Sequence, residues 1–286
     1  MRAILYLFIA IFVFGILEPS FTNKVNAQNR ILIQSTDSKA SSILLTQSAQ
    51  IISARLKDFS PEKFDIKVIP EKNQILVTLT SNLDLKIVER LLTQKGSLAF
   101  YETYDRAGLT DLLNGDKKLF SLFADNHDNQ ADVKIGCTTV AEVEKVTNYL
   151  KTLGQVEKCK FVWDQHFENS NVCLYALKTD GKKGALIVGE DIESVQCKQD
   201  KAPKDNAIAI KLKKPAIGIW ADATKRNINH AIAIVLDNHV LAAPTVRSVI
   251  TGGLCEITGD YTQNQAKYIA ALGNNGALPL HFKIAK

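Results

Sequence analysis

The sequence predicts an α+β protein, in which helices pack on antiparallel sheets, built as two subdomains. Apolar residues recur at intervals of three and four in several segments, as on one face of a helix. In other segments they alternate with polar residues, and turn residues join pairs of such segments, which is typical of half-buried antiparallel hairpins. The chain has 286 residues, which is more than one compact domain usually has, so two subdomains are expected.

The first subdomain, a base, is predicted over residues 28–104. Its pattern is strand, helix, strand, strand, helix, strand, with Gly96 placed to stop the second helix. Two βαβ-like halves of this kind indicate a ferredoxin-like sheet with both helices on one face. Residues 279–286 are predicted to complete this base, because alternate residues there are apolar. The six elements are centred on residues 30–33, 45–59, 64–68, 75–79, 84–94 and 98–100.

The second subdomain is predicted as an inserted α+β head over residues 105–278. The boundary is placed at Tyr104 because residues 105–136 are rich in Asp, Asn and Gly. Thr139 and Glu142 form a capping-box pattern ahead of a helix. Strands are also predicted at 160–163 and 172–177, and a charged exposed loop at 198–206.

The C-terminal third has the most regular pattern. A helix is predicted from Pro215 to Asn227, and a second helix begins at the capping-box pair Thr262 and Gln265. Between the two helices, apolar residues 231–236 indicate the first strand of a hairpin.

Turn residues mark the rest of this region. Asp237 and Asn238 are expected to form a tight hairpin turn, and Pro244 is expected to end the return strand. Glycine adopts positive φ without strain, so glycines are predicted at further turns of that kind. These glycines are Gly252, Gly253 and Gly259.

The N-terminus has the pattern of a secretory signal peptide over residues 1–27. Arg2 is followed by an apolar run that ends at Leu17, short of the roughly 20 residues that a membrane-spanning helix needs. Cleavage between Ala27 and Gln28 would place the mature chain in the periplasm. The alternative is an uncleaved helix that anchors the chain to the inner membrane. No later apolar stretch is long enough to cross a bilayer.

Composition and spacing argue against several classes of function. The formal net charge is only +5 at pH 7, so no nucleic-acid partner is expected. The glycines lack the lysine of a nucleotide site and the histidines lack metal-ligand spacing, so no cofactor, metal or small-molecule substrate is expected. Cys255 and His239 could imitate a thiol nucleophile and its general base. No sequence feature identifies a third group that would orient the base, so a non-catalytic protein is preferred to a cysteine hydrolase.

The cysteines fit an exported protein. In an oxidising compartment they can form up to two disulfides and leave one free thiol, and the sequence leaves the pairing open. None of them stands in a CxxC pattern, so neither a redox centre nor a zinc cluster is indicated. They are Cys137, Cys159, Cys173, Cys197 and Cys255.

A series of motifs in the C-terminal third carries a more specific signal. It contains an AIVLD strand and turn, an AAP return, an ITGG turn, an ITG helix entry and a GALP exit, at residues 233–237, 242–244, 250–253, 257–259 and 276–279. The series resembles the signature of the large periplasmic domain of SecD, the accessory subunit of the bacterial Sec protein-export machine. Upstream matches are a W-x-x-x-T-x-x-N helix at 220–227, an F-x-W strand at 161–163 and a segment at 186–191. Asn238 stands where the family has glycine.

The resemblance implies a base with a mobile head, no cofactor, and conformational roles for the motif residues. SecD proteins continue into a transmembrane bundle, and the resemblance covers only the periplasmic domain. We therefore expect a stand-alone exported protein that does not use the proton-motive force. The residues with implied conformational roles are Asp237, Asn238, Pro244, Gly252, Gly253, Gly259, Gly276 and Pro279.

The function implied by this resemblance is binding of unfolded preproteins as they emerge from the Sec translocon at the outer face of the inner membrane. The alternative is a structural paralogue that docks onto a membrane complex and never binds substrate. An apolar groove or patch on the head distinguishes the two, since only a peptide receptor needs one. A hinge is expected where the head joins the base, near Tyr104 and Leu278-Pro279.

Overall fold

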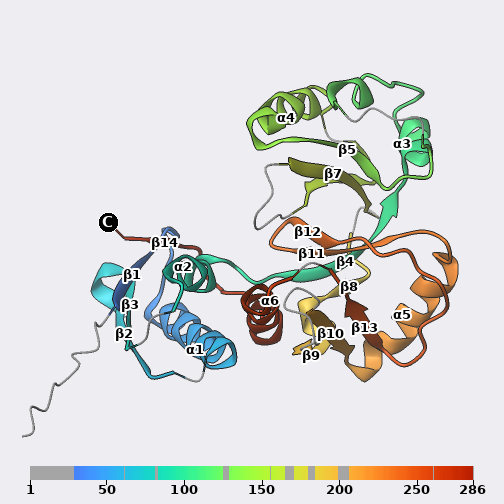
Figure 1. Cartoon of the computed structure of the whole chain (residues 1–286). Helices are drawn as coiled ribbons and strands as arrows, with labels where there is room; N and C mark the ends of the chain where they lie inside the picture. The colour runs from blue at the N-terminus through green and yellow to red at the C-terminus, as the bar shows by residue number, and fades with distance from the viewer. Residues whose placement is uncertain are drawn as a thin grey trace, which may run out of the picture.

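The computed structural model describes residues 29–60, 62–80, 83–124, 129–154, 156–164, 171–179, 184–198, 206–259 and 261–285. Figure 1 shows a smaller body, which contains the first helices and strands, beside a larger one. The predicted signal peptide, its cleavage site at Ala27 and Gln28 and most of the predicted loop 198–206 lie outside the described residues. Within the described ranges, no helix has the length and apolar character needed to cross a membrane.

The smaller body, the base, is a four-stranded antiparallel sheet covered by two helices. The first and last strands of the described chain lie side by side, because β1 pairs with both β3 and β14. Helices α1 (Ser42–Phe59) and α2 (Leu85–Thr93) bury apolar residues against the sheet. This is the split βαβ arrangement of a ferredoxin-like sheet. The strand order is β14-β1-β3-β2, with β1 Asn29–Ser35, β2 Phe64–Ile69, β3 Gln74–Leu79 and β14 Phe282–Ile284.

Strand β4 (Leu98–Tyr104) departs from the prediction. The sequence predicts it as the last strand of the base, but in the structure it pairs with strands of the larger body, and β14 takes the place beside β1. Leu98, Ala99 and Phe100 are buried in succession, which suits a central strand covered on both faces. A local apolar pattern shows that a segment is a strand, but it does not show which sheet the strand joins.

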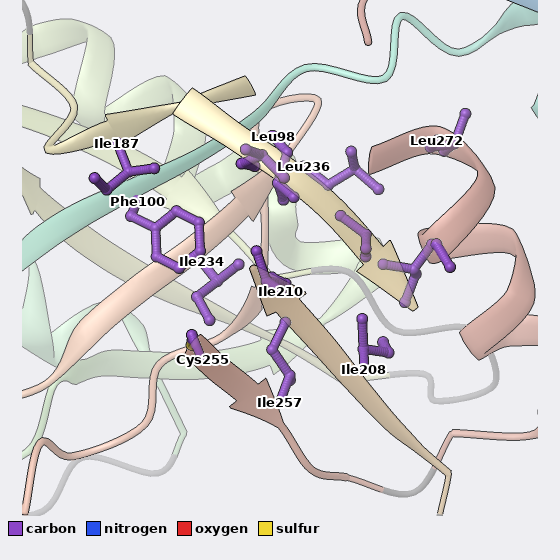
Figure 2. Packing of buried hydrophobic residues seen from close by; sticks show 14 of the residues in the cluster. Leu98, Phe100, Ile187, Ile208, Ile210, Ile234, Leu236, Cys255, Ile257 and Leu272 are labelled. Carbon is purple, nitrogen blue, oxygen red and sulfur yellow. The ribbon is translucent and has the colours of Figure 1, made fainter. Parts of the chain in front are cut away.

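The larger body, the head, holds two sheets. The larger sheet follows the order β12-β11-β4-β7-β5, with β6 beside β7 and β8 beside β4, and the smaller sheet is β13-β10-β9. The main core lies between these sheets, where β4 and β11 face β10 and β13 (Figure 2). The bounds are β5 Lys134–Thr139, β6 Cys159–Trp163, β7 Asn171–Lys178, β8 Ile187–Val188, β9 Ile192–Lys198, β10 Ala207–Leu212, β11 Ile232–Leu236, β12 His239–Ala242 and β13 Leu254–Ile257.

Two helices complete this core. Helix α5 (Lys214–Arg226) places Trp220 edge-on against Phe100 of β4, with 5.3 Å between the ring centroids. Helix α6 (Gln263–Asn275) begins at the capping box predicted from Thr262 and Gln265, in which each side chain bonds the other residue's backbone N–H. Because α6 packs on both α1 and β9, it lies between base and head (Figure 1).

The outer part of the head has a core of its own, formed by β5, β6 and β7 with helices α3 (Arg106–Leu112) and α4 (Val143–Thr152). The capping box predicted here is wrong. Thr139 makes no side-chain cap, and the carboxylate of Glu142 instead accepts a hydrogen bond from the hydroxyl of Thr138 (2.8 Å). Thr138 is buried, so its hydroxyl needs a partner, and Glu142 provides one.

One disulfide joins neighbouring strands of this outer part. It links Cys137 of β5 to Cys173 of β7, which are paired across the ladder. Cys159, Cys197 and Cys255 are free. Cys197 and Cys255 lie on the strands that flank β10 on its two sides, so β10 separates them.

Candidate functional site

Asp237 and Asn238 form the two-residue turn between β11 and β12, with φ values of 48° and 67°. Left-handed backbone at both positions is what a type I′ hairpin turn requires, and asparagine tolerates it better than most residues do. The Asp237 carboxylate accepts hydrogen bonds from the backbone N–H groups of Gly96 (2.8 Å) and Ser97 (2.7 Å). The head hairpin is thereby fastened to the segment that enters β4.

Arg55 of α1 lies on the other side of this segment. Its guanidinium is fully buried and donates to four backbone carbonyls, those of Leu91 (3.1 Å), Gln94 (2.7 Å), Lys95 (2.5 Å) and Gly276 (2.7 Å). Burial lowers the pKa of Arg55 to about 10, so the group remains charged at neutral pH. The Arg55 side chain therefore caps the C-terminal end of α2. It also bonds both connections between base and head, one at Lys95 and one at Gly276.

The two connections run side by side. The N–H of Leu278 donates to the carbonyl of Lys95 (2.8 Å). Gly96 has a φ of +80°, and a Cβ there would come within 2.2 Å of Arg55 Nη2, so a side chain does not fit. Gly276 has a φ of 71°, and Pro279 follows in the same connection, exposed. The entry into the head thus lies at residues 95–97, whereas the sequence predicts it near Tyr104.

Replacing Asp237 by glycine is expected to lower the free energy of unfolding by about 2 kcal/mol. Glycine keeps the left-handed turn but loses both hydrogen bonds to Gly96 and Ser97. Hydrogen bonds to charged groups contribute about 1.5–3 kcal/mol each, and water offsets part of this loss because the bond to Ser97 is exposed and the bond to Gly96 only partly buried. Urea unfolding measures the loss. The matched control is Asp237→Asn, which keeps one acceptor oxygen and should lose less. A glycine variant as stable as the parent would contradict the fastening role.

An apolar cleft of about 230 Å³ opens in the head between α5, β11 and β13. Its floor is Trp220, Ile232 and Ile234, and the segment 244–250 and β13 form its walls. Of the large apolar residues that are exposed in the described part of the chain, four belong to the elements around this cleft. They are Ile219, Ile228, Val249 and Leu254. Of these four residues, Leu254 lines the cleft itself.

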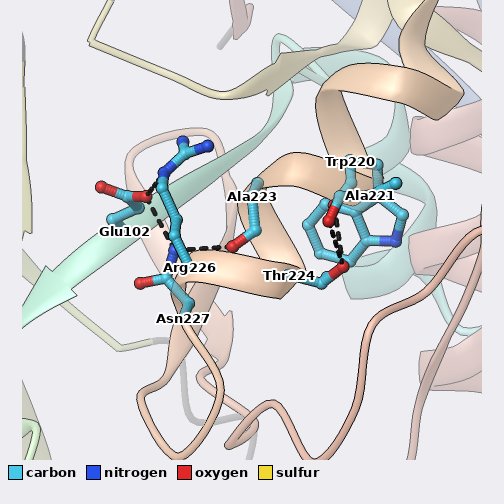
Figure 3. Close-up of polar contacts among 7 residues, drawn as sticks. All are labelled: Glu102, Trp220, Ala221, Ala223, Thr224, Arg226 and Asn227. Carbon is cyan, nitrogen blue, oxygen red and sulfur yellow. Dashed lines mark hydrogen bonds and ion pairs between the residues drawn. The ribbon is translucent and has the colours of Figure 1, made fainter.

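The motif helix fixes one wall of the cleft. Thr224 is buried, donates to the carbonyl of Trp220 (2.9 Å) and accepts from the N–H of Ile250 (3.0 Å). Asn227 donates to Glu102 of β4 (2.7 Å), which also pairs with Arg226 (2.6 Å), as Figure 3 shows. These contacts hold α5 against β4 and hold the segment 244–250 against α5.

The predicted turn glycines differ from one another. Gly253 has a φ of +64°, and a Cβ there would lie 2.6 Å from Cγ1 of Ile217, so both its backbone and its surroundings require glycine. Gly252 and Gly259 do not have positive φ, which corrects the prediction for these two. Pro244 follows the return strand β12 and lines the cleft.

Cys255 and His239, which imitate a catalytic pair in the sequence, each have an environment of their own in the structure. Cys255 is buried, and burial raises the pKa of its thiol to about 12, so the reactive thiolate is disfavoured. The ring Nδ1 of His239 lies 3.0 Å from the carbonyl oxygen of Asp237, its own neighbour in the turn. Among the described residues, no group of three His, Cys, Asp or Glu side chains is placed to hold a metal ion.

Part of the chain is similar to known proteins. Residues 173–280 match the family model "SecDF, P1 head subdomain". The chain is 30% identical over 107 residues to "Protein translocase subunit SecD" of Acidaminococcus fermentans, covering 37% of this chain and 25% of that protein. It is 32% identical over 103 residues to SecD of Calditerrivibrio nitroreducens, covering 36% and 20%. The chain thus spans about a quarter or less of the length of these relatives.

Solved structures show the same fold. A crystal structure of SecDF in a "Super-membrane-facing form" matches with a TM-score of 0.56 at 20% identity, over 92% of this chain and 30% of that one. A second SecDF structure, of "a membrane component SecDF that enhances protein export", matches with a TM-score of 0.53 at 18% identity, over 90% and 98%. The class is therefore an α+β domain of the kind found in SecDF. Within that class, residues 173–280 are similar to the SecDF P1 head subdomain, and the resemblance to SecD that the sequence indicates is confirmed.

Proposed function

We propose that this chain is a non-enzymatic periplasmic module that assists Sec-dependent protein export by binding unfolded polypeptide. The apolar cleft within the matched head subdomain is the observation that carries this proposal. Unfolded chains expose apolar side chains that folded proteins bury, and a cleft lined by Trp220, Ile232 and Ile234 offers such side chains a place out of water.

The volume of the cleft suits a few side chains of a polypeptide segment better than a drug-sized ligand. Pockets that enclose a drug-sized ligand measure roughly 300–1,000 Å³, and this cleft measures about 230 Å³. It has room for one or two side chains of a longer ligand. A receptor of this kind binds weakly, because ordering a disordered segment costs about 2–5 kcal/mol or more, and weak binding allows the cargo to be released.

Other features support export and the absence of catalysis. The disulfide Cys137–Cys173 fits an oxidising compartment such as the periplasm, in agreement with the signal peptide predicted at residues 1–27. Burial raises the pKa of both Cys159 and Cys255 to about 12, which makes both thiols poor nucleophiles at neutral pH. The partners proposed are therefore unfolded preproteins and the Sec translocon.

Binding to a permanently unfolded protein tests this function. Reduced, carboxymethylated α-lactalbumin, labelled with a fluorophore, should bind the chain, with an affinity read from fluorescence anisotropy. Leu254→Asp places a charge on the exposed cleft rim and should weaken binding about tenfold, since a charge resists transfer next to apolar groups. Val140→Asp is the matched control, because Val140 is equally apolar and exposed but lies in the outer part of the head.

The two outcomes that contradict the proposal have different meanings. No binding by the unaltered chain would favour the alternative, a paralogue that docks onto a membrane complex without holding substrate. Equal weakening by Leu254→Asp and Val140→Asp would show binding that does not involve the cleft.

A further inference from the structure

Strand β13 has an open edge beside the cleft. Among the described strands it pairs with β10 alone, and Leu254, Cys255 and Glu256 of β13 line the cleft. An open strand edge presents unpaired N–H and C=O groups, which are a template for another strand. The open edge of β13 therefore borders the cleft.

The register of β13 fixes which backbone groups face outward. The N–H of Leu212 donates to the carbonyl of Gly253 (2.8 Å), so these two residues form a hydrogen-bonded pair. In an antiparallel ladder such pairs alternate with pairs that exchange no hydrogen bond, which makes Ile210 and Cys255 the next bonded pair. The N–H and C=O groups of Leu254 and Glu256 consequently point away from β10, toward the open edge.

The cleft floor holds a polar group without a partner. Trp220 is 3% exposed, and its indole Nε1 is buried and donates no hydrogen bond to any described residue. Buried donors of this kind are rare in native proteins, and each one calls for an explanation. Because this nitrogen has no exposed surface, a ligand carbonyl in the cleft reaches it only when a side chain that covers it shifts, and the carbonyl then provides the missing acceptor.

We propose that an extended polypeptide segment adds as a strand to the open edge of β13 and accepts a hydrogen bond from Trp220 Nε1. This inference rests on the proposed function and names the ligand class of that site. Successive side chains of a strand point to opposite faces, so residues of the added strand on the Cys255 face enter the cleft. Their neighbours lie on the other face of the sheet, where the exposed Leu254 and Glu256 border the rim of the cleft. The preferred ligand is therefore a segment in which apolar and polar residues alternate.

Two variants of Glu256 test the strand pairing. A fluorescent peptide of alternating valine and threonine, with a lysine at each end for solubility, is the probe, and its dissociation constant is measured by anisotropy. Glu256→Pro removes an N–H that β10 does not use, so the sheet is kept while the open edge is blocked. Glu256→Thr loses the same carboxylate and the same ion pair with Lys198 but keeps the N–H. The proline variant should bind the peptide about tenfold more weakly than the threonine variant.

A Trp220→Phe variant tests the indole donor. It keeps an aromatic ring on the cleft floor and removes the N–H, and the lost hydrogen bond should weaken peptide binding about fivefold to tenfold. Circular dichroism and thermal unfolding check that the fold is retained. If this variant fails to fold, the Glu256 pair decides the question without it.

The outcomes separate this inference from the proposed function. Equal peptide affinities for Glu256→Pro and Glu256→Thr would overturn the strand addition, even if the chain still binds carboxymethylated α-lactalbumin. Failure of the unaltered chain to bind either the peptide or that unfolded protein would overturn the proposed function as well.

Discussion

Replacing Arg55 by methionine is expected to lower the free energy of unfolding by at least about 4 kcal/mol. The guanidinium donates to four carbonyls, and methionine leaves all four without that donor in a buried site. Hydrogen bonds to charged groups contribute about 1.5–3 kcal/mol each, and buried groups left unpaired add a cost of their own. Because whole domains are stable by only about 5–15 kcal/mol, much of the variant should be unfolded under mild denaturing conditions.

Urea unfolding followed by circular dichroism measures this loss. Lys57→Met is the matched control, because Lys57 is an exposed residue in the last turn of the same helix. Arg55→Lys should fall between the two, since an ammonium group keeps the charge but cannot reach four carbonyls in the planar arrangement of a guanidinium. A loss below about 1 kcal/mol for Arg55→Met would show that the two connections hold together without this side chain.

Replacing Phe100 by alanine is expected to lower the free energy of unfolding by about 3–5 kcal/mol. Phe100 is fully buried between the two sheets of the head (Figure 2) and lies edge-on to Trp220. The substitution removes a large apolar side chain and leaves a cavity that a rigid sheet fills poorly. Since Trp220 is the floor of the cleft, the variant should also bind unfolded polypeptide more weakly.

Chemical denaturation again measures the stability, and anisotropy measures the binding. Phe100→Leu is the control, because it keeps most of the apolar volume and should cost about half as much or less. A loss near 1 kcal/mol for Phe100→Ala would contradict the central position of β4 and would instead suit a strand at the edge of a sheet.

Local chemistry was enough to predict several parts of this structure. The turn at Asp237 and Asn238 follows from residues that tolerate left-handed backbone, and the start of α6 follows from the reciprocal bonds that Thr262 and Gln265 can make. In each case the residues that determine the geometry are neighbours in the chain. The sequence did not predict the cleft, and an apolar groove on the head was only the feature expected to distinguish a peptide receptor from a docking paralogue.

The parts that the sequence did not predict depend on distant partners. The Asp237 carboxylate bonds a residue 141 positions away, and Arg55 bonds one 221 positions away. The pattern of β4 fits a strand in either sheet, and only packing against Trp220 and β11 decides between them. At Glu142, a capping pattern was overridden because the buried Thr138 took the carboxylate.

The pairing of β1 with β14 also has a consequence for the order in which the protein folds. The base sheet is complete only after Phe282–Ile284 have been synthesised, so the base has the most distant contacts in the described chain. A disordered loop of that length would slow the pairing, because bringing its ends together costs conformational entropy. A head that folds first brings Lys95 and Leu278 into contact, and the loop left to close is then about a quarter as long. Folding of the head therefore lowers the entropic cost of pairing the last strand with β1.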